Sequence, residues 1–313
     1  MGRRRQRGRP VSGIILTDKP QGLTSNQVLQ QVKRLFGAAK AGHTGSLDPL
    51  ATGVLPICLG EATKYSQYLL DADKGYRTTA TLGAKTTTGD AEGEIIEQKP
   101  VADISEAQID SVLPQFMGEI QQIPSMYSAI KVDGQPLYKL ARQGVEIERK
   151  ARTVRIYSLK KLQYQSPELK LEVLCSKGTY IRSLVEDIGE QLGCGGYVSE
   201  LRRFSAGPYD EEQLYTFEQL QQIRDEGGHQ ALDELLLPVD TAVMHWPEVL
   251  LTEATGFYVQ QGQPVTVSKA PTSGWVRLYL GEQRQFIGIG EIDDEGRVAP
   301  RRLIKTNVVN TTG

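Results

Sequence analysis

The segment AGHTGSLDPLATGVLP, residues 41–56, decides how the rest of the chain is interpreted. It holds three glycines, two prolines and a single carboxylate, Asp48. Glycines adopt backbone angles closed to other residues and let a ligand approach the main chain. Pro49 disfavours a helical conformation at the aspartate before it. The segment therefore predicts a tightly shaped loop that presents one acid, with a plain glycine- and proline-rich surface loop as the alternative on composition alone.

Together with GEATK at residues 60–64, this segment resembles the catalytic loop of the bacterial TruB family of tRNA pseudouridine synthases. In that family the aspartate of the G-[ST]-L-D-P-x-A-[ST]-G-x-L run is catalytic, and the matching residue here is Asp48. A run of this length is far more specific than a short motif. The resemblance covers residues 12–240, the expected catalytic domain. It implies an α+β pseudouridine synthase fold, in which helices and loops flank a mixed, largely antiparallel central sheet.

Composition is ordinary for a folded protein, and 313 residues suggest two domains. No apolar run reaches the length of a membrane span and no signal-peptide core is visible, so no membrane partner is expected. Three cysteines without a CxxC pair predict buried thiols in a reducing, cytoplasmic setting. Three scattered histidines predict no metal site. Conversion of uridine to pseudouridine is neither redox nor phosphoryl-transfer chemistry, so no cofactor is expected.

The net charge of −2 hides an asymmetry. Residues 1–80 carry 12 Lys and Arg against 5 Asp and Glu, a charge of +7, and the remainder carries −9. Phosphate binding responds to such local charge rather than to the whole-chain value. The Arg-rich residues 1–11 are expected to form a disordered tail that either holds RNA phosphates nonspecifically or has no role.

Within residues 12–240, some segments show the hydrophobic period of a helix and others that of a strand. Strands and helices do not alternate in repeating βαβ units, which favours an α+β fold. A Thr-Ser-Asn run at 24–26 predicts a helix start. Strands are expected at 13–20, 76–82, 94–97 and 169–175, and helices at 27–36, 61–71, 105–117 and 183–192.

Residues 124–152 form a basic insertion in which tyrosines alternate with lysines and arginines. Such a mixture suits phosphate contact and base stacking, with a solvated surface as the alternative. The resemblance implies that this insertion is the RNA-gripping thumb of the family.

Composition changes again near residues 238–247. Beyond this point short strands are expected at 257–260, 265–267, 276–280, 286–291 and 298–303. They predict a small all-β domain over residues 246–310. Its position and pattern resemble the PUA-like RNA-binding domains that accompany this family.

The resemblance also implies the residues that surround Asp48. Arg182 matches the arginine that pairs with the catalytic aspartate, a task that suits a planar, permanently charged guanidinium. Tyr76 matches the tyrosine that stacks on the target base. Tyr180 matches an aromatic wall of the uracil pocket, and Leu201 an apolar wall.

Other matching residues lie at the edge of this set. His43 corresponds to the family's loop histidine, which stacks where bases flip out of the RNA loop. Lys19 and Pro20 match a motif that buttresses the catalytic loop. Lys64 is a candidate phosphate contact.

These matches predict an enzyme that isomerises uridine 55 in the T loop of tRNA, with a possible accessory role in tRNA folding. Composition gives no sign of an oligomer interface, so a monomer is expected. The matches leave three routes open for Asp48: attack at C1′, addition at C6, or removal of the 2′ proton. Three alternative functions are an RNA-binding chaperone without chemistry, a guide-RNA-dependent synthase and a nucleoside glycosidase. The 124–152 insertion argues against a guide RNA, and the absence of a second acid in the motifs argues against a glycosidase.

Overall fold

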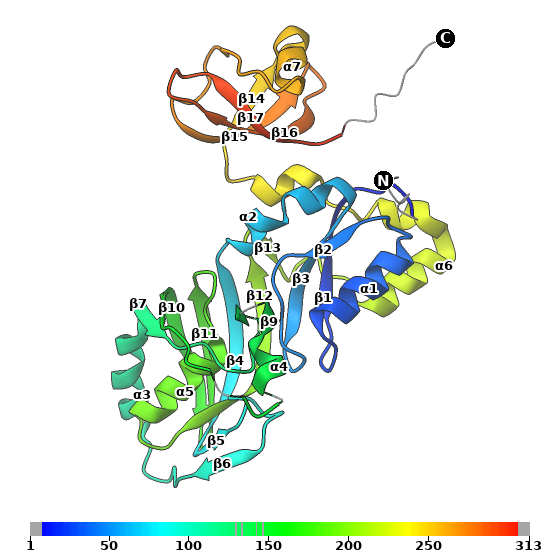
Figure 1. The fold of residues 1–313 in the computed structure, drawn as a ribbon. Helices are drawn as coiled ribbons and strands as arrows, with labels where there is room; N and C mark the ends of the chain where they lie inside the picture. The colour runs from blue at the N-terminus through cyan, green and yellow to red at the C-terminus, as the bar shows by residue number, and fades with distance from the viewer. Residues whose placement is uncertain (1–7, 129, 133, 142, 146, 306–313) are drawn as a thin grey trace.

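The computed structural model describes residues 8–128, 130–132, 134–141, 143–145 and 147–305. A large mixed sheet with helices on its sides forms the N-terminal unit, and a four-stranded sheet forms a separate C-terminal unit (Figure 1). This arrangement confirms the expected α+β fold. No helix in the described ranges is long and apolar enough to cross a membrane.

The central sheet has the order β1-β3-β12-β4-β11-β10-β7, with β2 beside β3 and β13 beside β12. All its pairings are antiparallel except that of β3 with β12, which spans only Thr52 and Gly53 opposite Arg202 and Arg203. Its strands are β1 (Gly13–Lys19), β2 (Ala41–His43), β3 (Thr52–Leu59), β4 (Lys74–Leu82), β7 (Gly118–Gln122), β10 (Arg152–Gln165), β11 (Glu168–Cys175), β12 (Gly196–Ala206) and β13 (Tyr209–Asp210).

Helices cover the sheet at two places. The helical elements are α1 (Ser25–Leu35), η1 (Gly60–Lys64), α2 (Ser66–Leu70), α3 (Glu106–Val112), η2 (Leu113–Phe116), α5 (Ile181–Gln191), α6 (Phe217–Asp233) and η3 (Val239–Val243). In Figure 1, α1 and α6 lie side by side, and they share one apolar core with β1 and β3. A second core joins α3 and α5 to β4, β10, β11 and β12. The three cysteines are buried free thiols, as expected.

Several expected boundaries need correction. The glycine-rich segment 41–56 is a loop only over residues 44–51, because its ends belong to β2 and β3. The helices expected at 61–71 and 105–117 are each shared between a 3₁₀ turn and a short α-helix. Helix α6 is an element that periodicity did not reveal.

The expected disordered tail is wrong for residues 8–11, whereas residues 1–7 lie outside the described part. Arg9 forms a bridge to Ala38, with its amide donating to Gly37 O at 2.7 Å. Its guanidinium also forms an ion pair with Asp233 of α6. This stretch is therefore held against the N-terminal unit.

Two small hairpins extend from the main sheet. One consists of β5 (Ala84–Thr86) and β6 (Ile95–Gln98). The other lies in the 124–152 insertion and pairs β8 (Lys131–Val132) with β9 (Gln135–Pro136), followed by α4 (Leu137–Ala141).

The C-terminal sheet has the order β14-β15-β16-β17, formed by β14 (Glu248–Leu251), β15 (Gly274–Leu280), β16 (Gln285–Ile292) and β17 (Val298–Leu303). The strand expected at 257–260 is wrong, since these residues end α7 (Glu253–Gln260). The Thr252 hydroxyl caps this helix by accepting from Thr255 N, a signal that the aromatic pair Phe257 and Tyr258 concealed. Residues 265–267 form only an isolated bridge, between Val265 and Val298.

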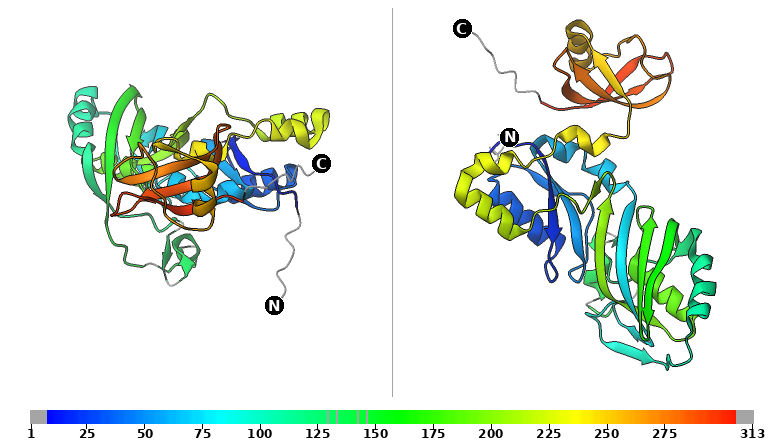
Figure 2. Two further views of the ribbon diagram at one scale, coloured as in Figure 1. Left: turned by 90° about the horizontal axis from the view of Figure 1, so that it is seen from above. Right: turned by 180° about the vertical axis from the view of Figure 1, so that it is seen from behind.

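An aromatic cluster joins the two units. Trp246 stacks on Trp275 with ring centroids 5.2 Å apart, and Tyr68 of α2 meets Trp246 edge-on at 4.9 Å. Figure 2 shows the C-terminal unit beyond α2 and η3, at one end of the molecule. Lys64 belongs to this junction, because its ammonium donates to Leu303 O at 2.8 Å and pairs with Glu61 at 2.6 Å.

Candidate active site

A cavity of about 350 Å³ lies between the 44–51 loop, strands β4 and β12, and the start of α5. Five of the six residues expected from the resemblance line it: Asp48, Tyr76, Tyr180, Arg182 and Leu201. They come from four separate segments of the chain. The structure thus brings together residues that lie up to 153 positions apart.

Buried polar groups hold the loop that carries Asp48. Lys19, at the end of β1, donates to Pro49 O at 3.1 Å and to Ala51 O at 2.6 Å. Ser25, at the start of α1, accepts from Leu47 N at 2.7 Å and donates to Leu47 O at 3.1 Å. These contacts fix the main chain on both sides of the aspartate. Burial lowers the pKa of Lys19 to about 8, although the nearby Asp48 charge opposes that shift.

Arg182 lies in the first turn of α5 and forms an ion pair with Asp48, Nε to Oδ2, at 3.0 Å. Its other nitrogens donate to Thr88 O at 2.8 Å and to Tyr127 O at 3.0 Å. The Arg182 side chain is 5% exposed and that of Asp48 is 39% exposed. The guanidinium is therefore a fixed, buried anchor, and the carboxylate remains open to the cavity.

A second carboxylate, Asp90, approaches the same guanidinium at 3.5 Å. It is almost fully buried, accepts from the Thr88 hydroxyl at 2.5 Å and from Glu92 N at 3.1 Å, and does not line the cavity. No sequence motif singled out Asp90. Nothing in a single sequence separates this aspartate from an ordinary turn aspartate, so its pairing with Arg182 was missed.

The Asp48 carboxyl experiences opposing influences. Burial raises its pKa, the adjacent Arg182 lowers it, and Asp90 raises it again, with a net rise. A carboxylate held charged by an arginine while poorly solvated is more basic and more nucleophilic than one in water. This suits chemistry at a sugar carbon or at a C–H bond.

Tyr76 and Tyr180 stand on two sides of the cavity. Tyr76, on β4, is 9% exposed, and burial raises the pKa of its phenol. Tyr180 precedes α5, and its backbone is clamped by Gln122, which accepts from Tyr180 N at 3.0 Å and donates to Tyr180 O at 3.2 Å. Leu201 is 8% exposed and completes an apolar wall. Two rings and one aliphatic side chain suit a flat, uncharged base.

His43 does not line this cavity, although the resemblance groups it with the site. It ends β2, opposite Ile57 of β3. Its buried Nδ1 is without a hydrogen-bond partner among the residues that the structure describes. Burial, and then the charge of Arg203, lower the pKa of His43, which keeps the imidazole neutral at pH 7.

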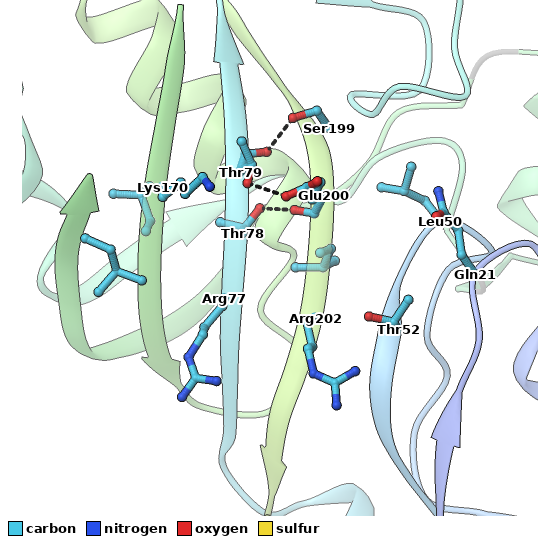
Figure 3. A pocket seen from close by; sticks show the side chains of 13 residues that line it. Gln21, Leu50, Thr52, Arg77, Thr78, Thr79, Lys170, Ser199, Glu200 and Arg202 are labelled. Carbon is cyan, nitrogen blue, oxygen red and sulfur yellow. Dashed lines mark hydrogen bonds between the residues drawn. The ribbon is translucent and has the colours of Figure 1, made fainter. Parts of the chain in front are cut away.

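A second groove is lined by residues of β4, β11 and β12 together with Gln21, Leu50 and Thr52 (Figure 3). Its arginines already have carboxylate partners: Arg77 pairs with Glu172 at 3.1 Å, and Arg202 pairs with Asp18 at 3.0 Å. The hydroxyls of Thr78 and Thr79 are bonded to Glu200, as the dashed lines in Figure 3 show. Within the described ranges, no three His, Cys, Asp or Glu side chains gather closely enough to hold a metal ion.

Family models cover most of the chain. Residues 33–181 match the model of the N-terminal domain of TruB family pseudouridylate synthases. Residues 182–244 match that of the tRNA pseudouridylate synthase B C-terminal domain, and residues 247–304 that of the pseudouridine synthase II TruB C-terminal domain.

Individual proteins agree with these models. The tRNA pseudouridine synthase B of Stutzerimonas stutzeri (strain A1501) is 58% identical over 298 residues, which cover 95% of this chain and 97% of the relative. That of Aeromonas salmonicida (strain A449) is 57% identical over 309 residues, 97% of each chain. Among solved structures, a chain of a Cbf5-Nop10-Gar1 complex matches with a TM-score of 0.72 and 28% identity, covering 94% of this chain and 84% of its own. More than half of the residues are thus shared with synthases over nearly their whole length, and the chain belongs to the bacterial TruB family of pseudouridine synthases.

Proposed function

We propose that this enzyme isomerises uridine 55 in the T loop of tRNA, with Asp48 as the catalytic carboxylate. The observation that carries the proposal is the Asp48–Arg182 ion pair at 3.0 Å, at the wall of a cavity that two tyrosines and a leucine also line. The relatives named above are tRNA-modifying synthases, which supports tRNA as the substrate. The T-loop position follows from the family resemblance of the Asp48 segment.

The reaction breaks the C1′–N1 bond, turns the detached uracil and joins C5 to C1′. Asp48 lines a cavity rather than an open surface, so we expect the enzyme to flip the base out of the RNA loop to reach it. In our proposal Tyr76 stacks on the uracil, while Tyr180 and Leu201 close the pocket so that the free base is retained. Asp48 acts by one of three routes, which are attack at C1′, addition at C6 or removal of the 2′ proton.

His43 has a separate role in this proposal. Because it lies outside the cavity and is neutral, it is suited to stacking in the RNA loop from which the bases have been flipped, rather than to moving protons.

In this proposal the N-terminal unit makes most of the contacts with the tRNA backbone. The 124–152 insertion carries six basic and three acidic side chains, which supports a role as an RNA-gripping thumb. Residues 247–305 carry seven of each, and four of the arginines there form ion pairs with carboxylates: Arg277, Arg284, Arg297 and Arg301. We therefore expect the C-terminal PUA-like domain to contribute shape and few phosphate contacts.

The enzyme is proposed to act as a monomer, in the cytoplasm where its tRNA substrate resides, and without a guide RNA. Identity of 58% to a tRNA pseudouridine synthase B, against 28% to the chain of the Cbf5 complex, favours a stand-alone enzyme. A glycosidase needs a second acid as leaving-group donor, and Asp90 does not reach the cavity.

Tritium release from tRNA transcripts labelled at uridine C5 tests the proposal. The parental protein should release one tritium per tRNA, whereas Asp48→Asn should release none and keep its tRNA affinity within severalfold. A transcript with cytidine at the target position, labelled at the remaining uridines, controls for the site. Turnover by Asp48→Asn near the parental rate would remove Asp48 from the mechanism. Clear binding without release by the parental protein would favour a tRNA-folding chaperone.

A further inference from the structure

Arg203 of β12 is a buried cation at the wall of the active-site cavity. It is 1% exposed, its Nε donates to Val54 O at 2.8 Å, and its Nη2 donates to Gly45 O at 3.3 Å. Within the described part of the chain, no carboxylate forms an ion pair with it. A buried charge without an opposite charge beside it lowers the stability of the folded protein, so we expect this charge to have a functional role.

The neighbouring backbone packs closely on Arg203, both on its main chain and on its guanidinium. Gly45 has a φ of +122°, and a Cβ added there would lie 3.6 Å from Arg203 Nη1. At Gly53, with a φ of +100°, an added Cβ would lie only 2.2 Å from Arg203 O. The two glycines therefore let the catalytic loop and β3 close directly onto Arg203.

Arg203 of β12 lies directly opposite Tyr76 of β4 in the antiparallel pairing of these two strands. Its charge acts on the phenol, since it lowers the pKa that burial raises. Arg182, by contrast, lies next to two carboxylates, those of Asp48 and Asp90, so its positive charge is already neutralised. Arg203 thus places a buried positive charge beside Tyr76 at the wall of the cavity.

We propose that Arg203 stabilises the uracil anion formed when the glycosidic bond breaks. This inference rests on the proposed isomerisation. When C1′–N1 cleaves, the bonding electron pair leaves with N1, and the negative charge spreads over the uracil ring and its two oxygens. Recombination then uses an electron pair at C5, C5 loses its proton, and N1 gains one. A preorganised cation beside Tyr76 lowers the energy of the charged intermediate without moving during the reaction.

A leaving-group experiment separates this electrostatic role from a structural one. Two tRNA transcripts carry either uridine or 5-fluorouridine at the target position. Loss of the target nucleoside is followed under single-turnover conditions by nuclease digestion and chromatography. Fluorine withdraws electrons and stabilises the uracil anion by itself, so a residue that supports this anion matters less for the fluorinated substrate.

For Arg203→Met we expect cleavage of uridine to slow by roughly 10²–10³-fold, as for loss of an oxyanion-stabilising donor. The loss should be at least tenfold smaller with 5-fluorouridine, and Arg203→Lys should lie between the parent and Arg203→Met. Arg202→Met, which removes the adjacent arginine from the opposite face, should leave both rates unchanged. Should Arg203→Met fail to fold, Arg203→Lys provides the same comparison.

Equal slowing of both substrates in the Arg203 variants would overturn the inference and leave Arg203 as a structural residue. Absence of cleavage by the parental protein would instead count against the proposed function itself. The two failures are therefore distinguishable in one experiment.

Discussion

Replacing Ser25 by alanine should slow catalysis although Ser25 does not line the cavity. Its hydroxyl is the partner of both backbone groups of Leu47, the residue before Asp48. The cap of α1 is Thr24, which accepts from Gln27 N, so the helix itself persists in the variant. The change therefore acts on the catalytic loop.

The magnitude follows from the buried groups that lose their partner. An unpaired buried N–H costs about 1–3 kcal/mol. For a domain of this size each kcal/mol lowers Tm by about 2–4 °C. If the loop relaxes to avoid that cost, Asp48 shifts, and a displacement of about 1 Å costs up to about 10²-fold in rate. We expect kcat to fall by about 10–100-fold, with tRNA affinity within about threefold.

The assay is single-turnover tritium release, together with thermal unfolding and tRNA binding by filter retention. Ser105→Ala is the matched control, because Ser105 caps α3 far from the loop and accepts from Gln108 N at 3.3 Å. Loss of that cap should cost about 1 kcal/mol of stability and leave kcat unchanged. A parental kcat in a folded Ser25→Ala protein would refute the reasoning, as would equal slowing in both variants.

Two further changes probe the supports of the site. The pKa of Lys19 is lowered to about 8 in the folded protein, against about 10.4 in an unfolded chain, so between these values the unfolded state binds more protons. The free energy of unfolding of the parent relative to Lys19→Met should therefore rise by up to about 3 kcal/mol from pH 7.5 to 10.5 in urea titrations, and a constant difference would contradict this. Trp246→Ala removes the ring between Trp275 and Tyr68 and should cost about 3–5 kcal/mol. Calorimetry should then resolve two transitions, and a single unshifted transition would show that the junction does not depend on this ring.

Local patterns predicted β1, β4 and β11 of the central sheet, and in β11 the burial of side chains alternates as expected for a strand. In β11, Leu169, Leu171 and Val173 are buried, and Lys170 between them is exposed. The same logic failed for α6, whose helical pattern is interrupted where Gly228 adopts a φ of 70°. No strand was expected where β12 begins, because Gly195 and Gly196 are not typical of a strand, whereas the structure continues the sheet from Gly196. Pattern therefore predicts an element where one face is buried and the residues also favour that element locally.

The sequence likewise predicted some residues of the candidate site and missed others. Motif resemblance selected Asp48 and Arg182, which the fold places 3.0 Å apart. It did not select Asp90 or Arg203, because an aspartate in a turn and an arginine next to another arginine are ordinary surface features in a sequence. Only the fold reveals that both are almost fully buried.

Residues from separate motifs along the chain all bind the loop that carries Asp48. Lys19 bonds the carbonyls after Asp48, Ser25 bonds the residue before it, and Arg203 bonds Gly45 in the same loop. Each contact comes from a different element, so the loop has no freedom to move independently of the sheet. Preorganisation of this kind is the main means by which an active site stabilises developing charge without reorganising during the reaction. It also explains why a buried lysine and a buried arginine are retained near Asp48, because their cost in stability is offset by a catalytic loop that is held in place.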